Sequence, residues 1–310
     1  MPCGIDTLYY YRMKRIASLF AVAAVCAGLF SCASSPSRGQ PGSSVWEVSK
    51  DGNALFLGGS IHILRDTDYP LPKEFDRAFS RSAALVLETD VEQMADESVN
   101  QYRMAKVTLP DGQTLQTILD ADAYEALEAK FGEYGIPISL IAKFKPSMAI
   151  LMLTTLQIQK FGFVQQGVDA HYLQKAKDKG KAIYYLETMQ DQIDMIATMG
   201  DGYESDYVRY SLQDMEDTET RLAELLAEWK AGDSSNMEAT LTEMKEQWPA
   251  LYSTLVANRN AAWMPHITKY LDSGQVFFVI VGLGHLHGPD GLLRQLEDSG
   301  YAVEQVNRRR

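Results

Sequence analysis

The feature that most constrains the fold is an apolar run near the carboxyl end of the chain, Val276 to Val281, which reads VFFVIV and is closed by Gly282. Short runs of aromatic and β-branched residues that end on glycine are typical of strands buried on both faces of a sheet. A short helical segment at 289–300 and a strand-like segment at 301–306 follow this run. A strand, a helix and a strand in this order form a parallel unit, so we predict an α/β protein.

Three other segments are expected to add strands to this sheet. Residues 45–59 alternate around the turn signal Asp51-Gly52, which predicts a β-hairpin. The runs AALVLETD at 83–90 and KAIYYLETM at 181–189 predict two further strands, each of which ends in acidic residues. Together these segments favour a central, largely parallel sheet.

Most of the remaining sequence has helical periodicity. Residues 91–160 and 191–273 predict a large helical insertion in the middle of the α/β fold. An internal echo is also present, because Leu85–Thr89 and Tyr184–Thr188 both place a glutamate after a leucine at a strand end. The echo predicts a sheet that is built from two related halves.

The amino-terminal segment has the pattern of a targeting signal. Three cationic residues between Arg12 and Arg15 precede an apolar run at 16–30, which has about the length of the hydrophobic part of a signal peptide. The run ends in Leu-Phe-Ser-Cys at 29–32, which resembles a bacterial lipobox. We therefore predict that 1–32 is a lipoprotein signal peptide and that Cys32 carries the lipid, in preference to a plain secretory cut.

This prediction fixes the expected domain boundaries and location. Met13 would begin a conventional leader, so it is a second candidate for the start of translation. Residues 33–44 are rich in serine, glycine and proline and predict a flexible tether, whereas a buried helix at 16–30 would not be followed by such a segment. The rest, 45–310, is expected to form one α/β domain in the bacterial cell envelope, anchored to a membrane by lipid on the periplasmic face or in the outer membrane.

Charge and cysteine content exclude several classes of function. The chain carries a net charge of −12 and has no basic stripe, so a nucleic acid is not an expected partner. Only Cys3, Cys26 and Cys32 are present, and all lie in or before the predicted leader. The globular part therefore has neither a disulfide nor a thiolate metal cluster.

Two of the five histidines follow glycine in the same way at the ends of predicted strands. His62 follows Gly59, and His285 follows Gly282, each three residues later. The predicted strands at 83–90 and 181–189 add Glu88 and Glu187 near their ends. Because ligands of open parallel sheets bind beyond the carboxyl ends of the strands, these four side chains are candidates for one site.

Two imidazoles and one or two carboxylates are a common ligand set for a divalent metal such as Mn, Co or Zn. A bound metal would activate water, and the glutamate that is not a ligand would take its proton. The alternative is that each histidine is a structural residue and each glutamate caps a helix or forms an ion pair. His171 and His266 lie on helical segments and are expected to be structural, and His287 is expected to face solvent.

Longer stretches of the chain resemble a known family. LGGSIHIL and LVLETD, the central block QGVDAHYLQKAKDKGKAIYYLET and the carboxyl-terminal block from ANRNAAW to YAVEQV are similar to the TraB/PrgY/GumN family, which is related to the Tiki metalloproteases. The resemblance extends over roughly 45–306. The carboxyl-terminal block includes the pair Arg259-Asn260.

The resemblance implies one metal-dependent site. His62, His285 and Glu88 would hold a divalent metal, with Glu88 and Glu187 as candidates for the catalytic base. Arg259 and Asn260 would position these groups or orient the substrate, whereas the sequence alone favours an exposed helix pair. The implied function is a metal-dependent hydrolase that cleaves a peptide or small amide at the cell envelope. The alternative is a binding protein that sequesters a peptide or a metal-containing ligand without turnover.

Overall fold

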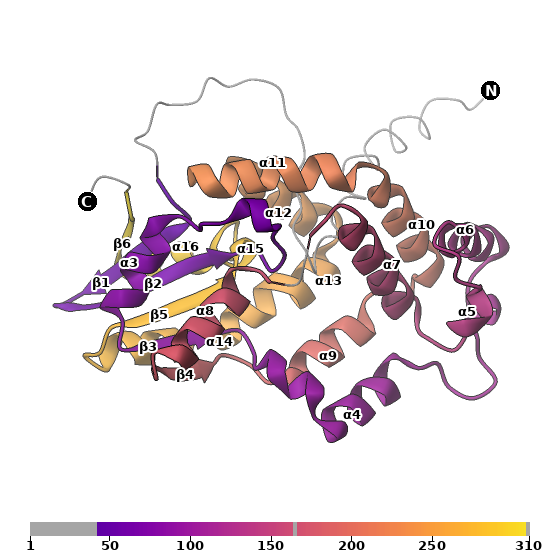
Figure 1. Cartoon of the computed structure of the whole chain (residues 1–310), viewed down its shortest axis with the longest axis horizontal. Helices are drawn as coiled ribbons and strands as arrows, with labels where there is room; N and C mark the ends of the chain where they lie inside the picture. Colours follow the sequence, from indigo (N-terminus) through magenta and orange to yellow (C-terminus); the bar gives the residue numbers. More distant parts are fainter. Residues whose placement is uncertain (1–41, 164–165, 308–310) are drawn as a thin grey trace. The chain divides into compact units, whose positions relative to one another are not determined.

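The fold was analysed in a computed structural model of the chain, which describes residues 42–163 and 166–307 (Figure 1). The predicted signal peptide, Met13, Cys32 and residues 33–41 of the expected tether lie outside the described residues. Ser43 and Ser44, which were counted with the tether, are buried in the fold. Their hydroxyls donate hydrogen bonds to the carbonyls of Val306 and Trp229, at 2.9 and 3.0 Å.

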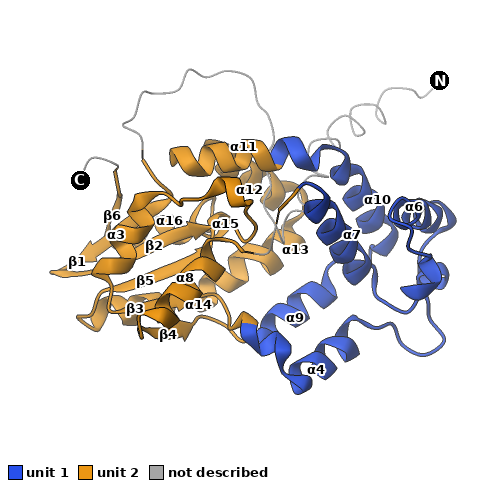
Figure 2. Cartoon of the chain, viewed as in Figure 1, with its two compact units in different colours: residues 1–29, 92–161, 189–221 blue, residues 30–91, 162–188, 222–310 orange. Residues whose placement is uncertain are grey.

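The described residues divide into two compact units (Figure 2). The sheet unit contains the described residues up to Val91, Gly162–Thr188 and the chain from Leu222 onward. The helical unit consists of Glu92–Phe161 and Met189–Arg221. The helical unit therefore consists of two segments that are separated in the sequence by Gly162–Thr188 of the sheet unit. The assignment of 45–310 to one domain stays a prediction.

The sheet unit contains a six-stranded, largely parallel sheet with the order β4-β3-β5-β2-β1-β6. The strands are β1 (Val45–Lys50), β2 (Asn53–Ser60), β3 (Ala84–Leu87), β4 (Ala182–Tyr185), β5 (Phe277–Gly282) and β6 (Ala302–Gln305). Pairings β2–β5, β5–β3 and β3–β4 are parallel, and β1 is antiparallel to both β2 and β6. The predicted α/β class is confirmed. In this order β3 and β4, which lead to the two Leu-Glu-Thr segments, are neighbours. The strands β2 and β5, which lead to the two G-x-x-H segments, are also neighbours.

The predicted hairpin is confirmed, with a two-residue turn between β1 and β2. Asp51 has φ 51° and Gly52 has φ 85°, which is the conformation of a type I′ turn. The Asp-Gly pair suits this turn because both residues tolerate positive φ. The relationship of two halves of the sheet stays a prediction.

Helices cover both faces of the sheet, so β5 is buried from both sides. On one face, α14 (Asn258–Asp272) and α16 (Leu292–Asp298) pack on alternate residues of the strands, with Trp263, Ile267 and Val279 in the core. On the other face, α3 (Lys73–Arg81) and α8 (Val168–Asp178) pack on Phe278 through aromatic rings. Burial from both faces explains the uninterrupted apolar run from which the strand was predicted.

The remaining helices of the sheet unit lie between these elements in the sequence. They are η1 (Asp66–Asp68), the Leu222–Ala231 part of α11 (Thr218–Ala231), α12 (Ser235–Gln247), α13 (Pro249–Tyr252), η5 (Ser253–Ala257) and α15 (Leu283–Leu286). The segment η5 is a π-helical turn between α13 and α14. Such turns insert an extra residue into a helix and often occur near functional side chains.

The helical unit is built from helices and short helical turns. Its elements are η2 (Val91–Ala95), α4 (Glu97–Val107), α5 (Leu115–Ile118), α6 (Ala121–Gly132), η3 (Ile138–Leu140), α7 (Pro146–Lys160), α9 (Met189–Thr198), α10 (Glu204–Asp214) and η4 (Met215–Asp217). Val99, Met189 and Ile193 form an apolar cluster between α4 and α9. Within the described ranges, no helix is both long and apolar enough to cross a bilayer.

Candidate functional site

The parallel strands bring the predicted site residues together at one edge of the sheet. The segments after β3 and β4 run side by side, since the backbone N–H of Glu187 donates to the carbonyl of Glu88 at 2.9 Å. His285 lies in α15, the single helical turn that follows β5, and His62 lies two residues beyond β2. All four residues belong to the sheet unit.

Gly282 lies at the centre of this arrangement. A Cβ atom at this position would lie 3.3 Å from Nε2 of His62, 3.3 Å from Oε1 of Glu88 and 3.6 Å from Cδ2 of His285. Nε2 of His62 and Cδ2 of His285 are therefore at most 6.9 Å apart. The absence of a side chain on Gly282 therefore lets these three residues converge.

The side chain of Arg259 connects the other members of the site. Its Nη2 donates to Oε2 of Glu88 at 2.5 Å and to Oε1 of Glu187 at 2.7 Å, and its Nε donates to Oε2 of Glu187 at 3.1 Å. Its Nη1 bonds to Nε2 of His285 at 2.8 Å and to the carbonyl of Leu255 in η5 at 3.3 Å. All five N–H donors of the guanidinium are thus engaged by groups of the chain itself.

The hydrogen bonds of His285 fix its tautomer. Because Arg259 can only donate, Nε2 of His285 is the acceptor, and Nδ1 therefore carries the proton and donates to Oδ1 of Asn260 at 2.7 Å. Desolvation, with the positive charge of Arg259, lowers the pKa of His285 to about 3, so the ring is neutral. Asn260 is fully buried and also donates to the carbonyls of His285 and Asp290, which ties α14 to the loop after β5.

Glu88 is a buried carboxylate that stays ionised. Burial alone would raise its pKa, but the charges of Arg259 and His62 and the N–H of Gly282 lower the pKa to about 2. The N–H of Gly282 donates to Oε1 at 2.5 Å. A carboxylate held in this way is a weak base, and it contributes negative charge at the site rather than proton transfer.

His62 is held by a residue that the sequence analysis did not identify. Its Nδ1 lies 3.1 Å from Oδ1 of Asp169, which also accepts a hydrogen bond from Oγ of Ser60 at 2.7 Å. Desolvation acts to lower the pKa of His62, but the charge and hydrogen bond of Asp169, with the charge of Glu88, raise the pKa to about 9. The other ring nitrogen, Nε2, lies 4.0 Å from Oε1 of Glu88, and the side chain is 37% exposed.

Asp169 reaches His62 because the start of α8 lies very close to the end of β2. A Cβ atom on Gly167 would lie 2.2 Å from the carbonyl oxygen of Ile61 and 2.5 Å from Cα of His62, so only glycine fits there. The N–H of Val168 donates to that same carbonyl at 3.0 Å. In the sequence, this contact is indicated only by Gly167, which precedes Asp169 by two positions.

Trp263 forms the apolar wall of the site. Its ring centroid lies 4.4 Å from that of His285, and the guanidinium carbon of Arg259 lies 4.6 Å from its ring. Its indole N–H donates to Oε2 of Glu187 at 3.1 Å. Trp263 thus holds the neutral histidine, the guanidinium and the carboxylate in fixed positions.

The arrangement does not fit the metal site that the family resemblance implies. In residues 42–163 and 166–307, no three His, Cys, Asp or Glu side chains are placed to hold a metal ion. Two of the three expected ligands, Glu88 and His285, are hydrogen-bonded to Arg259 instead, as is the candidate base Glu187. The divalent metal stays a prediction, and these contacts do not support it.

His287 does not face solvent, so that expectation was wrong. Residues 283–286 form the helical turn α15 rather than an extended strand, and this turn directs His287 into the fold, where it is 5% exposed. Its ring packs edge-on against Trp46, and its Nδ1 lies 3.6 Å from Glu238. The expected structural role of His171 agrees with its ring contacts to Tyr69 and Tyr172.

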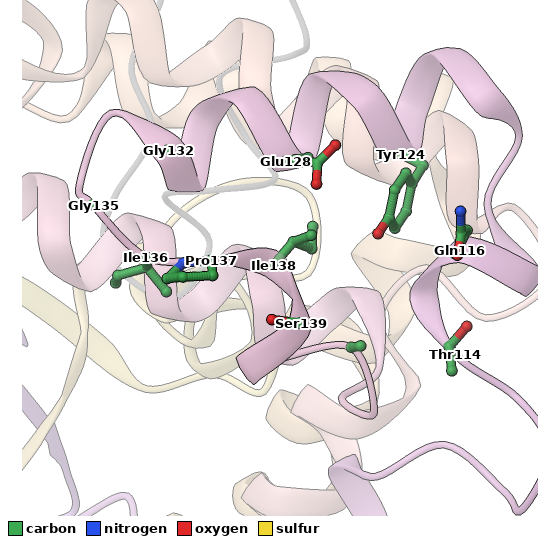
Figure 3. Close-up of a pocket in the computed structure, with 11 residues that line it drawn as sticks. Thr114, Gln116, Tyr124, Glu128, Gly132, Gly135, Ile136, Pro137, Ile138 and Ser139 are labelled. Atoms are coloured by element: carbon green, nitrogen blue, oxygen red, sulfur yellow. The ribbon is translucent and has the colours of Figure 1, made fainter.

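The helical unit has a cavity of its own. A pocket of about 570 Å³ is lined by residues of α6 and the segments on either side of it. Figure 3 shows Tyr124 and Glu128 on α6, with Ile138 and Ser139 across from them. The pocket contains none of the strand-end residues, so it is separate from the candidate site.

Comparison with known proteins identifies the family. The chain matches the TraB/PrgY/gumN family over residues 44–305. Two curated relatives, each named Uncharacterized protein YbaP, come from Escherichia coli (strain K12) and Shigella flexneri. Each is 27% identical over 259 residues, which cover 81% of this chain and 90% of the relative. No solved structure matches the chain. Because the match covers most of its length, this chain belongs to the TraB/PrgY/gumN family.

Proposed function

We propose that the chain is a hydrolase that cleaves a peptide or other amide bond, with His62 as the residue that transfers the proton. The observation that carries the proposal is the geometry of this imidazole. Asp169 fixes Nδ1 at 3.1 Å, while Nε2 faces Gly282. A histidine held at one nitrogen by a carboxylate and open at the other is a common arrangement for acid–base catalysis.

The protonation state of His62 suits the most demanding step of amide cleavage. When water attacks the carbonyl carbon and the carbon–nitrogen bond breaks, the attacking water loses a proton, which returns to Nε2 of His62 once this nitrogen has given up its own, so the ring ends the reaction as it began. Before that, the departing nitrogen must receive a proton. With a pKa of about 9, His62 carries that proton at neutral pH and can donate it from Nε2. Glu88 and Asp169 stabilise the charged form of the ring before the reaction.

The other site residues act on position rather than on the bond itself. Arg259 holds Glu88 and Glu187, and Asn260 holds His285, while no donor of the guanidinium is left for a substrate. We therefore assign Arg259 and Asn260 the role of positioning residues. This assignment chooses between the two roles that the family resemblance left open for them.

The proposal also includes the cell envelope as the location. The sequence pattern at 1–32 and the lipobox-like segment that ends at Cys32 support a lipid anchor, with the catalytic unit outside the cytoplasm. Peptides or small amides in that compartment are then the expected substrates.

A peptide library provides the test. Purified full-length protein is incubated with the library, and new amino termini are quantified by mass spectrometry for the wild type, His62→Ala and His266→Ala. We expect cleavage by the wild type and by His266→Ala, whose exposed imidazole lies on α14, and loss of cleavage by orders of magnitude in His62→Ala. Saturable binding of peptides with no cleavage in any sample would instead identify a protein that sequesters them.

A further inference from the structure

The two glutamates of the site converge on a single nitrogen atom. Nη2 of Arg259 lies 2.5 Å from Oε2 of Glu88 and 2.7 Å from Oε1 of Glu187. These carboxylates come from the ends of different strands, so the convergence is a property of the tertiary fold. A point between two such oxygens is the natural place for a cation.

A metal ion in this place would need the same atoms as ligands. Zinc and similar ions bind carboxylate oxygens and imidazole nitrogens at about 2.0–2.2 Å, with the ligand lone pairs directed at the ion. Here the carboxylates face Nη2, and the acceptor nitrogen of His285 faces Nη1 at 2.8 Å. The guanidinium and a metal therefore exclude each other.

We infer that the guanidinium of Arg259 is the resident cation of this site and stands where the family resemblance places a divalent metal. The positive charge balances part of the negative charge of the two carboxylates, as a metal would. Unlike a metal, it supplies no open coordination position and activates no water. The chemistry of the site then depends on the side chains of the chain alone.

Several contacts keep the guanidinium in place. It is 15% exposed, all its donors are engaged, and it stacks on Trp263 at 4.6 Å. Arginine remains charged at any pH at which the protein is folded, so loss of a proton cannot open the site. A metal would have to displace a cation that is hydrogen-bonded to its own intended ligands.

Titration calorimetry with metal chlorides tests the inference without reference to turnover. Full-length protein dialysed against a chelator is titrated with Mn²⁺, Co²⁺ and Zn²⁺ in turn. We expect no saturable binding to the wild type. In Arg259→Ala, Glu88, Glu187 and His285 lose their contacts with the guanidinium, and we expect binding of one ion and a metal-dependent rise in the midpoint of thermal unfolding.

Two further variants keep the result interpretable. Arg259→Gln, which preserves part of the side chain, replaces Arg259→Ala if circular dichroism shows that the alanine variant is unfolded. The double variant Arg259→Ala with His285→Ala should lose the binding that the single variant gains. If the wild type binds an ion, and this binding persists in His285→Ala but disappears in His266→Ala, the ion is bound at the exposed His266. That outcome agrees with the inference.

The inference is overturned if the wild type binds one ion and His285→Ala abolishes that binding, or if neither folded Arg259 variant gains affinity for any of the three ions. It rests on the same cluster as the proposed hydrolase, but the two can fail separately. Absence of peptide cleavage would refute the proposed function and leave the metal titrations as they are. Wild-type metal binding at His285 would refute the inference even if peptides are cleaved.

Discussion

Replacement of Asp169 by asparagine should lower the pKa of His62 and move the pH range in which the site works. The charge of Asp169 and its 3.1 Å contact with Nδ1 are the main favourable contributions that raise the pKa of His62 from 6.5 to about 9. The difference between 9 and 6.5 is 2.5 units, which would correspond to about 3.4 kcal/mol at 1.36 kcal/mol per unit. The side chain is 37% exposed, so solvent screening reduces this to on the order of 1 kcal/mol.

The effect on stability has a defined sign. A raised pKa contributes stability that is fully present below the unfolded value of 6.5 and is lost as the pH rises through about 9. The difference in unfolding free energy between the wild type and Asp169→Asn should therefore be largest near pH 6 and shrink between these two values. Peptide cleavage, which uses the protonated ring, should decline above pH 9 in the wild type and at least one unit lower in the variant.

Nuclear magnetic resonance measures the pKa directly. Protein labelled in the histidine rings is titrated, and the His62 signals are assigned by their absence from His62→Gln. The signals of His266, which is exposed on α14, provide an internal control for the labelling. If His62 titrates at the same pH in the wild type and in Asp169→Asn, the role given to Asp169 is wrong.

Three other changes test separate parts of the account. Gly282→Ala places a methyl group 3.3 Å from both His62 and Glu88, so peptide cleavage should fall at least tenfold while the far-ultraviolet circular dichroism is unchanged. Full activity would show that cleavage does not depend on the absence of a side chain at Gly282. His287→Ala removes a buried ring that packs on Trp46, and urea unfolding should show a loss of about 1 kcal/mol with cleavage retained, whereas a loss of cleavage without destabilisation would place His287 in the site. Metabolic labelling with palmitate should tag the wild type and not Cys32→Ser; an unlabelled, soluble wild type would contradict the lipid anchor.

The main strands and the convergence of the site could be predicted because both depend on short-range patterns. The apolar run that ends at Gly282 and the Asp51-Gly52 turn have few conformations open to them, and parallel strands place their carboxyl ends together. Glu88, Glu187, His62 and His285 meet for that reason. In the structure, each of these four residues lies within a few positions of the end of a strand.

The parts that were missed depend on long-range contacts that no local pattern reports. Asp169 is one of many acidic residues in the sequence, and only the approach of Gly167 to Ile61 makes it the partner of His62. His287 was assigned to solvent from the alternation of an extended chain, but the turn at 283–286 changes its direction by forming a helix. The five bonds of Arg259 likewise come from two strand ends, a π-helical turn and the helical turn α15.

The central claim is that Arg259 organises the strand-end residues into one site that holds no metal of its own. A crystal structure of the full-length protein grown with Mn²⁺, with data collected for anomalous scattering, tests this claim most directly. The account predicts that the guanidinium contacts Glu88, Glu187 and His285 as described here, with no anomalous peak among them. A manganese peak bound by His285 and Glu88, with Arg259 displaced, would contradict it.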